Sequence, residues 1–211
     1  MPPAAPASDV ASSAPRSPPA LYDDLQLSLA EAWRLLGEGV MQSDSAFHQP
    51  IVATTAQDGS ADARVMVLRQ VDVDARWLQF HSDLRAGKVH ELRRDDRAMV
   101  VAYDARAKVQ LRVSGCFAVH HDDTVATAAW EATRRFSRQC YRIAQQPGSV
   151  LAHPREADFQ PDADADCGRE YFAVLRLAVS RIEWLYLAAG GHRRAAFDWQ
   201  GENWQLHWLT P

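Results

Sequence analysis

The chain has 211 residues, of which 47% are hydrophobic and 24% are charged. This length and composition predict one globular domain, because two compact domains would each have too little core. The formal net charge of −4 excludes a strongly basic surface, so we expect no general affinity for nucleic acid or for anionic membranes.

The cysteine pattern and the hydropathy indicate the cellular compartment of the protein. Cys116, Cys140 and Cys167 are an odd number at long spacings, which argues against a disulfide scaffold and against a zinc site. No apolar run reaches the roughly 18 to 20 residues that a membrane span needs. The N-terminus also lacks a basic region followed by an apolar stretch. We therefore expect a reduced, cytoplasmic protein without a membrane segment.

The N-terminal segment and the first helix differ sharply in composition. Residues 1–20 are almost entirely Pro, Ala and Ser, which predicts a disordered tail and leaves residues 21–211 as the folded domain. The next apolar residues recur at spacings of three or four: Leu25, Leu29, Trp33, Leu36 and Val40. This periodicity predicts a helix over about residues 22–41 with one buried face.

After Pro50 the sequence changes to short runs that are typical of strands. The expected strands are residues 51–56, 63–71, 76–82, 98–103, 109–119, 171–180, 181–188, 193–199 and 203–209. Asp58-Gly59 and the turn at 200–202 predict hairpins, because Gly tolerates the positive φ of tight turns. Helices are expected at 84–94 and 123–145. Hairpin-linked strands need closure, so we predict a mainly β, α+β fold: an antiparallel barrel of six or more strands.

The first segment with chemical potential is RVMVLR, residues 64–69. Side chains alternate between the two faces of an extended strand. The alternation assigns Arg64, Met66 and Leu68 to one face, and Val65, Val67 and Arg69 to the other. Two arginines therefore bracket an otherwise apolar strand.

Two further segments carry cationic and polar side chains. FHSDLRAGK, residues 80–88, ends a strand with Ser82 and enters a helix that carries Arg85 and Lys88. A hydroxyl, two cations and the free N–H groups of a helix start make an anion site. In QLRVSG, residues 110–115, the polar side chains of Gln110 and Arg112 point together from an expected strand.

Taken in this order and at this spacing, the three segments resemble the pyridoxamine 5′-phosphate oxidase-like family of split β-barrels that bind flavin mononucleotide (FMN). The resemblance is to the oxidase-related branch, whose second motif reads TD-x-RS-x-K and corresponds here to residues 82–88. It extends from about Leu21 to Pro211. It implies that Arg64 and Lys88 bind the FMN phosphate and that Ser82 and Arg85 assist them.

The same resemblance implies roles for the remaining candidates. The backbone of residues 65–68 would face the isoalloxazine edge, and Gln110 would address the ring or the ribityl chain. Arg69 and Arg112 belong to the same segments and are further cofactor-binding candidates. The family holds its flavin in a groove between two subunits, which implies a homodimer. Trp184 and Arg194 are the candidates from the second chain.

The resemblance implies an FMN-dependent oxidoreductase whose substrate is unknown. The oxidase proper carries Lys where this chain has Arg69, and an Arg-x-His pair where this chain reads Gly190-Gly191-His192. We therefore do not expect the oxidase reaction itself, and no catalytic side chain is assigned. The alternative is a non-catalytic module that holds flavin, deazaflavin or haem.

No metal site is expected from the sequence. His120-His121 is followed by two aspartates, but adjacent residues on a strand point to opposite faces and cannot easily bind one ion together.

Overall fold

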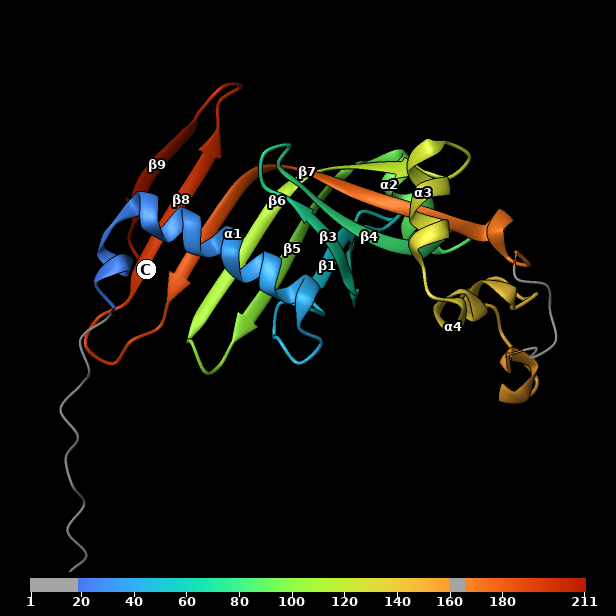
Figure 1. Ribbon diagram of the computed structural model, residues 1–211. Coiled ribbons are helices and arrows are strands. Elements are labelled where there is room, and N and C mark those ends of the chain that lie inside the picture. Colours follow the sequence, from blue (N-terminus) through green and yellow to red (C-terminus); the bar gives the residue numbers. More distant parts are fainter. Residues whose placement is uncertain (1–18, 160–165) are drawn as a thin grey trace, which may run out of the picture.

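The computed structural model describes residues 19–159 and 166–211 (Figure 1). The tail predicted to be disordered, residues 1–20, lies almost wholly outside the described residues. No helix in the described part of the chain is both long and apolar enough to cross a membrane.

One antiparallel sheet of nine strands dominates the fold, which confirms the predicted α+β class with six or more antiparallel strands. The strands are β1 (Ile51–Thr55), β2 (Ala61–Val65), β3 (Leu68–Asp72), β4 (Trp77–Asp83), β5 (Arg97–Asp104), β6 (Val109–His120), β7 (Phe172–Tyr186), β8 (Arg193–Trp199) and β9 (Trp204–Leu209). Their order is β2-β1-β5-β6-β7-β4-β3, and β8 pairs with both β7 and β9. The predicted turns at Gly59 and Gly201 have positive φ angles of 85° and 84°.

The first helix confirms the predicted periodicity. A short 3-10 helix (Ala20–Asp23) precedes α1 (Leu25–Met41). Asp24 caps the N-terminus of α1, and its carboxylate accepts the Leu27 N–H at 2.9 Å. Its buried face includes Leu29, Trp33 and Leu36. Figure 1 shows α1 lying across the sheet, where it contacts β3, β7, β8 and β9.

The predicted strand over residues 63–71 is wrong, because two strands share this segment. β2 ends at Val65 and β3 begins at Leu68, and these strands lie at opposite ends of the strand order. The backbone N–H of Met66 donates to Pro50 O at 3.0 Å, and that of Leu68 donates to His48 O at 2.9 Å. Both side chains are buried. The chain therefore turns a packed corner at Met66–Val67.

The two strands predicted at 171–180 and 181–188 form the single long strand β7. One edge of β7 pairs with β6, and the other pairs first with β4 and then with β8. The register shifts between Ser114 and Gly115, opposite Ser180. A Cβ on Gly115 would lie 2.0 Å from Ala178 O, so only glycine fits where β7 changes neighbours.

Two predicted helices are shorter than expected. Residues 84–94 form α2 (Gly87–Arg94) alone, since the Asp83 carboxylate holds the Arg85 N–H in a turn at 2.8 Å. Residues 123–145 form α3 (Thr124–Ala132), α4 (Arg135–Arg138) and a 3-10 helix (Gln139–Arg142). Thr133 has an extended backbone, with ψ 128°, and this ends α3. In Figure 1, α3 and α4 lie near one end of the sheet, while α1 crosses it.

Candidate functional site

The fold brings three of the predicted phosphate ligands into one cradle. Arg64 lies on β2, Ser82 on β4 and Lys88 in the first turn of α2. Lys88 Nζ lies 3.5 Å from Ser82 Oγ, which is buried. Burial lowers the pKa of Lys88 most, and the positive charge of Arg64, which is not in direct contact with it, lowers that pKa further. These contacts join residues that are far apart in the sequence.

Arg64 is held in the cradle by neighbouring oxygen atoms. Its Nη1 donates to Thr54 Oγ1 at 2.6 Å, and its Nη2 pairs with Glu91 Oε2 at 3.3 Å and with the Asp62 carboxylate. Thr54 Oγ1 in turn donates to Glu91 Oε2 at 2.5 Å. The Arg64 side chain is only 20% exposed. It is therefore oriented before any ligand arrives.

The donor set of the cradle fits a phosphate group. Burial lowers the pKa of Lys88 most strongly, and Arg64 lowers it further. Lys88 forms no ion pair within residues 19–159 and 166–211. The carboxylates that raise the pKa of Lys88, Asp83, Asp62 and Glu91, are already paired with Arg85 or Arg64. A phosphate would therefore add a negative charge beside the ammonium. The two cations are groups that phosphate oxygens accept from. The Ser82 hydroxyl now donates to Asp83 O at 3.1 Å and would have to rotate to donate to a phosphate.

Arg85 does not join this cradle. Its guanidinium pairs with Asp83, donates to the carbonyls of Ile143 and Ala144 at 3.0 Å each, and lies 3.6 Å above the Tyr171 ring. The expected helix that carries both Arg85 and Lys88 begins only at Gly87, so Arg85 precedes it and Lys88 lies in it. In this structure Arg85 anchors the segment after α4.

The corner at residues 65–68 leaves one backbone donor unpaired. The N–H groups of Met66 and Leu68 are bonded to Pro50 and His48. The N–H of Val67, between them, donates to no backbone acceptor in the described part of the chain. Val67 N–H is therefore the group of this segment that can address a ligand.

Gln110, Arg112 and Arg194 lie on the outer face of β6 to β8. Gln110 pairs with Leu185, and Leu185 pairs with Arg194. Gln110, Leu185 and Arg194 therefore form one cross-strand row. Arg112 Nη1 donates to Glu183 Oε2 at 3.2 Å, and Arg194 Nη2 donates to the same oxygen at 2.8 Å. Arg181 also pairs with Glu183. A single carboxylate thus holds three arginines on this face.

Trp184 requires a correction as a flavin-contacting residue. Its side chain is fully buried in its own subunit, packed against Tyr22 and Tyr186 at ring-centroid distances of 4.6 and 6.2 Å. The strand alternation points it inward, while Glu183 and Leu185 point outward. It cannot reach a ligand outside its own core.

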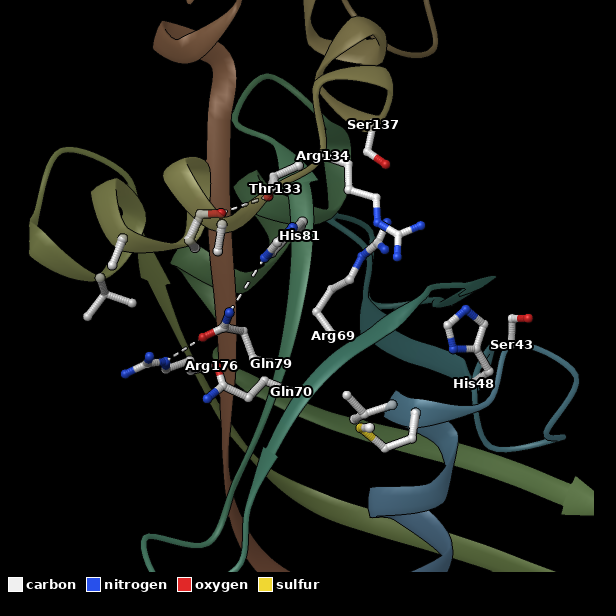
Figure 2. Close-up of a pocket in the computed structure, with 16 residues that line it drawn as sticks. Ser43, His48, Arg69, Gln70, Gln79, His81, Thr133, Arg134, Ser137 and Arg176 are labelled. Carbon is white, nitrogen blue, oxygen red and sulfur yellow. Dashed lines mark hydrogen bonds between the residues drawn. The ribbon is translucent and has the colours of Figure 1, made fainter.

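Arg69 lines a cavity of about 620 Å³ rather than the cradle. The cavity lies between the end of α1, strands β3, β4 and β7, and the α3–α4 segment (Figure 2). Its lining includes Arg134 and Arg176 and contains no Asp or Glu. None of the three arginines forms an ion pair with a carboxylate among the described residues. The cavity therefore carries an uncompensated positive charge.

A neutral imidazole also lines this cavity. Burial, and secondarily the charge of Arg69, lower the pKa of His81 to about 4. His81 Nε2 lies 3.5 Å from Gln79 Nε2, and Gln79 Oε1 accepts from Arg176 Nε at 2.9 Å. These contacts, drawn as dashes in Figure 2, make a chain from Arg176 through Gln79 to His81.

Sequence reasoning did not assign His81, Arg134 or Arg176 to a site, although the helical spacing of Arg134 with Trp130, Arg138 and Tyr141 had suggested a face near the site. His81 lies in the segment FHSDLRAGK, residues 80–88, where it directly precedes Ser82 and the second motif. Arg134 and Arg176 come from distant segments, and only the tertiary fold places them together.

His120 and His121 have separate partners. His120 Nδ1 contacts Asp123 Oδ2 at 2.7 Å, and His121 Nδ1 contacts Phe172 O at 3.0 Å. Within the described ranges no group of three or more His, Cys, Asp or Glu side chains could hold a metal ion.

Comparison with known proteins agrees with the fold and with the motifs. Residues 30–121 match the family model described as the FMN-binding domain of pyridoxamine 5′-phosphate oxidase. A pyridoxine/pyridoxamine 5′-phosphate oxidase from Cyanothece sp. is 26% identical over 166 residues, which cover 76% of this chain and 77% of the relative. The protein of the same name from Thermosynechococcus vestitus is 28% identical over 167 residues, with coverages of 76% and 77%.

Two solved structures share the fold. A pyridoxamine 5′-phosphate oxidase-related, FMN-binding protein from Nostoc punctiforme has a TM-score of 0.72 at 19% identity, covering 86% of this chain and 96% of its own. PhzG from Burkholderia lata, solved with tetrahydrophenazine-1-carboxylic acid, has a TM-score of 0.70 at 18% identity, with coverages of 91% and 96%.

The fold is therefore the split β-barrel of FMN-binding proteins. The comparisons confirm the resemblance to the pyridoxamine 5′-phosphate oxidase-like family that the three motifs predicted. The matched FMN-binding domain contains Arg64, Ser82 and Lys88 and ends before β7.

Proposed function

We propose that the chain binds FMN, with the phosphate held by Arg64, Ser82 and Lys88, and that it is an oxidoreductase acting on a small anionic molecule. The observation that carries the proposal is the cradle, which lies inside the matched FMN-binding domain and joins two cations and a hydroxyl. FMN, when bound, supplies hydride or electron transfer at its ring.

The residues of this chain would bind and orient the cofactor. Thr54 and Glu91 fix the Arg64 guanidinium, so little side-chain entropy is lost when it meets a phosphate. Lys88 supplies a second positive charge, and Ser82 supplies a hydroxyl donor. The Val67 N–H is the available backbone donor at the barrel corner. Gln110 and Arg112 remain candidates for the flavin ring or the ribityl chain.

The cavity favours a catalytic flavoprotein over a module that only holds the cofactor. It is of the size of a small-molecule site, and its unpaired Arg69 and Arg134 would attract an acidic group. The names of the two oxidase relatives specify substrates that carry a phosphate. An anionic substrate therefore fits both the charge of the cavity and the relatives.

Anaerobic reduction of the FMN-loaded protein tests this function. The panel pairs phosphorylated or carboxylated amines with their neutral parents, and adds NADH and NADPH. We expect at least one compound to bleach the flavin absorbance, and the anionic member of a pair to react faster. If no compound and neither nicotinamide reduces the flavin, the protein holds a cofactor without turnover.

The outer face of the barrel supports a homodimer. Val65, Ile51, Val101 and Arg112 form one cross-strand row on β2, β1, β5 and β6. Val65 and Ile51 are 60% and 45% exposed, and nearby Tyr103 is 47% exposed. An apolar patch beside Gln110, Arg112 and Arg194 suits a second copy of the chain. Covering it would enclose the cofactor candidates of this face between two subunits.

A cytoplasmic location belongs to the same proposal. Cys116, Cys140 and Cys167 are all free and exposed. Free surface thiols persist in a reducing compartment.

A further inference from the structure

Arg176 occupies a separate part of the cavity from Arg69 and Arg134. Figure 2 shows Arg176 at one side, Arg69 and Arg134 toward the other, and Gln79 and His81 between them. Arg176 comes from β7, whereas Arg69 comes from β3 and Arg134 directly precedes α4. The positive charge of the cavity is thus divided between two places.

Arg176 is held in position but not neutralised. Its Nε donates to Gln79 Oε1 at 2.9 Å, and its Cζ lies 4.3 Å from the centre of the Trp77 ring. Gln79 is buried, with 4% exposure, and is the register partner of Arg176 across β4 and β7. Neither terminal nitrogen of Arg176 donates a hydrogen bond within the described part of the chain. A fixed guanidinium with free terminal donors is suited to a carboxylate.

We propose that Arg176 binds a second acidic group of the substrate, at the opposite side of the cavity from Arg69 and Arg134. The substrate class is then a small molecule with two separated acidic groups. This inference rests on the proposed function, since it assigns the ligand of the same cavity. Gln79 is a positioning residue that sets the direction of the guanidinium.

The middle of the cavity is consistent with a ligand whose charges lie at its ends. His81 is neutral near pH 7, since burial and Arg69 lower its pKa to about 4. The α3 residues Val125, Ala128 and Ala129 add apolar wall. The simpler alternative is that Arg176 only stacks on Trp77 and remains solvated. A second acidic group on the ligand would then not increase its affinity.

Calorimetric titration with linear diacids separates these readings. The probes are glutarate, adipate and pimelate, each compared with the monocarboxylate of the same length: pentanoate, hexanoate and heptanoate. We expect at least one diacid to bind the full chain about tenfold tighter than its monocarboxylate. Arg176→Gln should abolish that advantage and leave monocarboxylate binding intact. Arg176→Lys should retain part of it, and Arg69→Gln should weaken both classes.

The control is Arg106→Gln, which changes an exposed arginine in the turn between β5 and β6. It should alter neither class of affinity. Equal affinity of the wild-type chain for diacids and monocarboxylates would overturn the proposal, even if the Arg176→Gln variant did not fold. An advantage that persists in Arg176→Gln would also overturn it.

The titrations are run with FMN-loaded and with cofactor-free protein. Failure to load FMN would contradict the proposed function. The difference in affinity between a diacid and its monocarboxylate, measured on the cofactor-free chain, would still test the role of Arg176. A diacid that displaces FMN would show that the cavity belongs to the cofactor, and would overturn the second acidic site.

Discussion

Alanine at Lys88 or at Arg64 is expected to weaken FMN binding by roughly thirty- to a hundredfold, because each change removes a charge-assisted bond to phosphate. The effect of Arg64→Ala should be the larger of the two. It leaves the Glu91 and Asp62 carboxylates beside the phosphate without the guanidinium that now pairs with them. Fluorescence titration of FMN into cofactor-free protein measures both affinities.

Riboflavin and a second lysine provide the controls. Riboflavin lacks the phosphate, so neither substitution should change its affinity. Lys108→Ala removes the other lysine of the chain, which is exposed in the turn before β6, and FMN affinity should not change. If Lys88→Ala weakened riboflavin and FMN equally, the phosphate would be bound elsewhere.

The pH dependence of the same titration follows from Lys88. Burial and Arg64 lower its pKa, and phosphate binds the protonated amine, so binding must raise that pKa again. FMN affinity should therefore fall as the pH rises through the lowered pKa of free Lys88, below the usual range of lysine. Lys88→Arg should flatten this dependence, because arginine stays charged. An unchanged profile in Lys88→Arg would contradict the role of Lys88.

If the proposed homodimer forms, Val65→Asp is expected to convert it to a monomer and to lower FMN affinity at least tenfold. A charge placed in an apolar interface is buried without a partner, at a cost of several kcal/mol. Light scattering after gel filtration measures the mass, and fluorescence titration measures the affinity.

Val73→Asp is the matched control for this prediction. Val73 is 50% exposed, close to the 60% of Val65, but it lies in the turn between β3 and β4, away from the apolar row. It should leave both the mass and the affinity unchanged. A wild-type monomer that binds FMN tightly would contradict the shared groove.

Much of the fold follows from local signals in the sequence. The apolar spacing of α1 and the glycines of the two tight turns identify elements that need no distant partner. The corner at Met66–Val67 could not be predicted in this way. It exists because the carbonyls of His48 and Pro50 accept the N–H groups of this segment, and these bonds form only in the tertiary structure.

The site was predictable where the motifs carry it. Arg64, Ser82 and Lys88 come together as the motifs suggested, although their role as ligands stays a prediction. Trp184 was misassigned, because motif spacing does not reveal that its side chain faces the core. Arg85 is held by Asp83, and its role as an assisting ligand stays a prediction.

The central claim is that the chain binds FMN, and the absorbance spectrum of the purified protein tests it most directly. The spectrum is recorded before and after incubation with FMN, with free cofactor removed. We expect flavin bands near one FMN per chain that remain after gel filtration. A colourless protein that stays colourless after incubation would contradict the account.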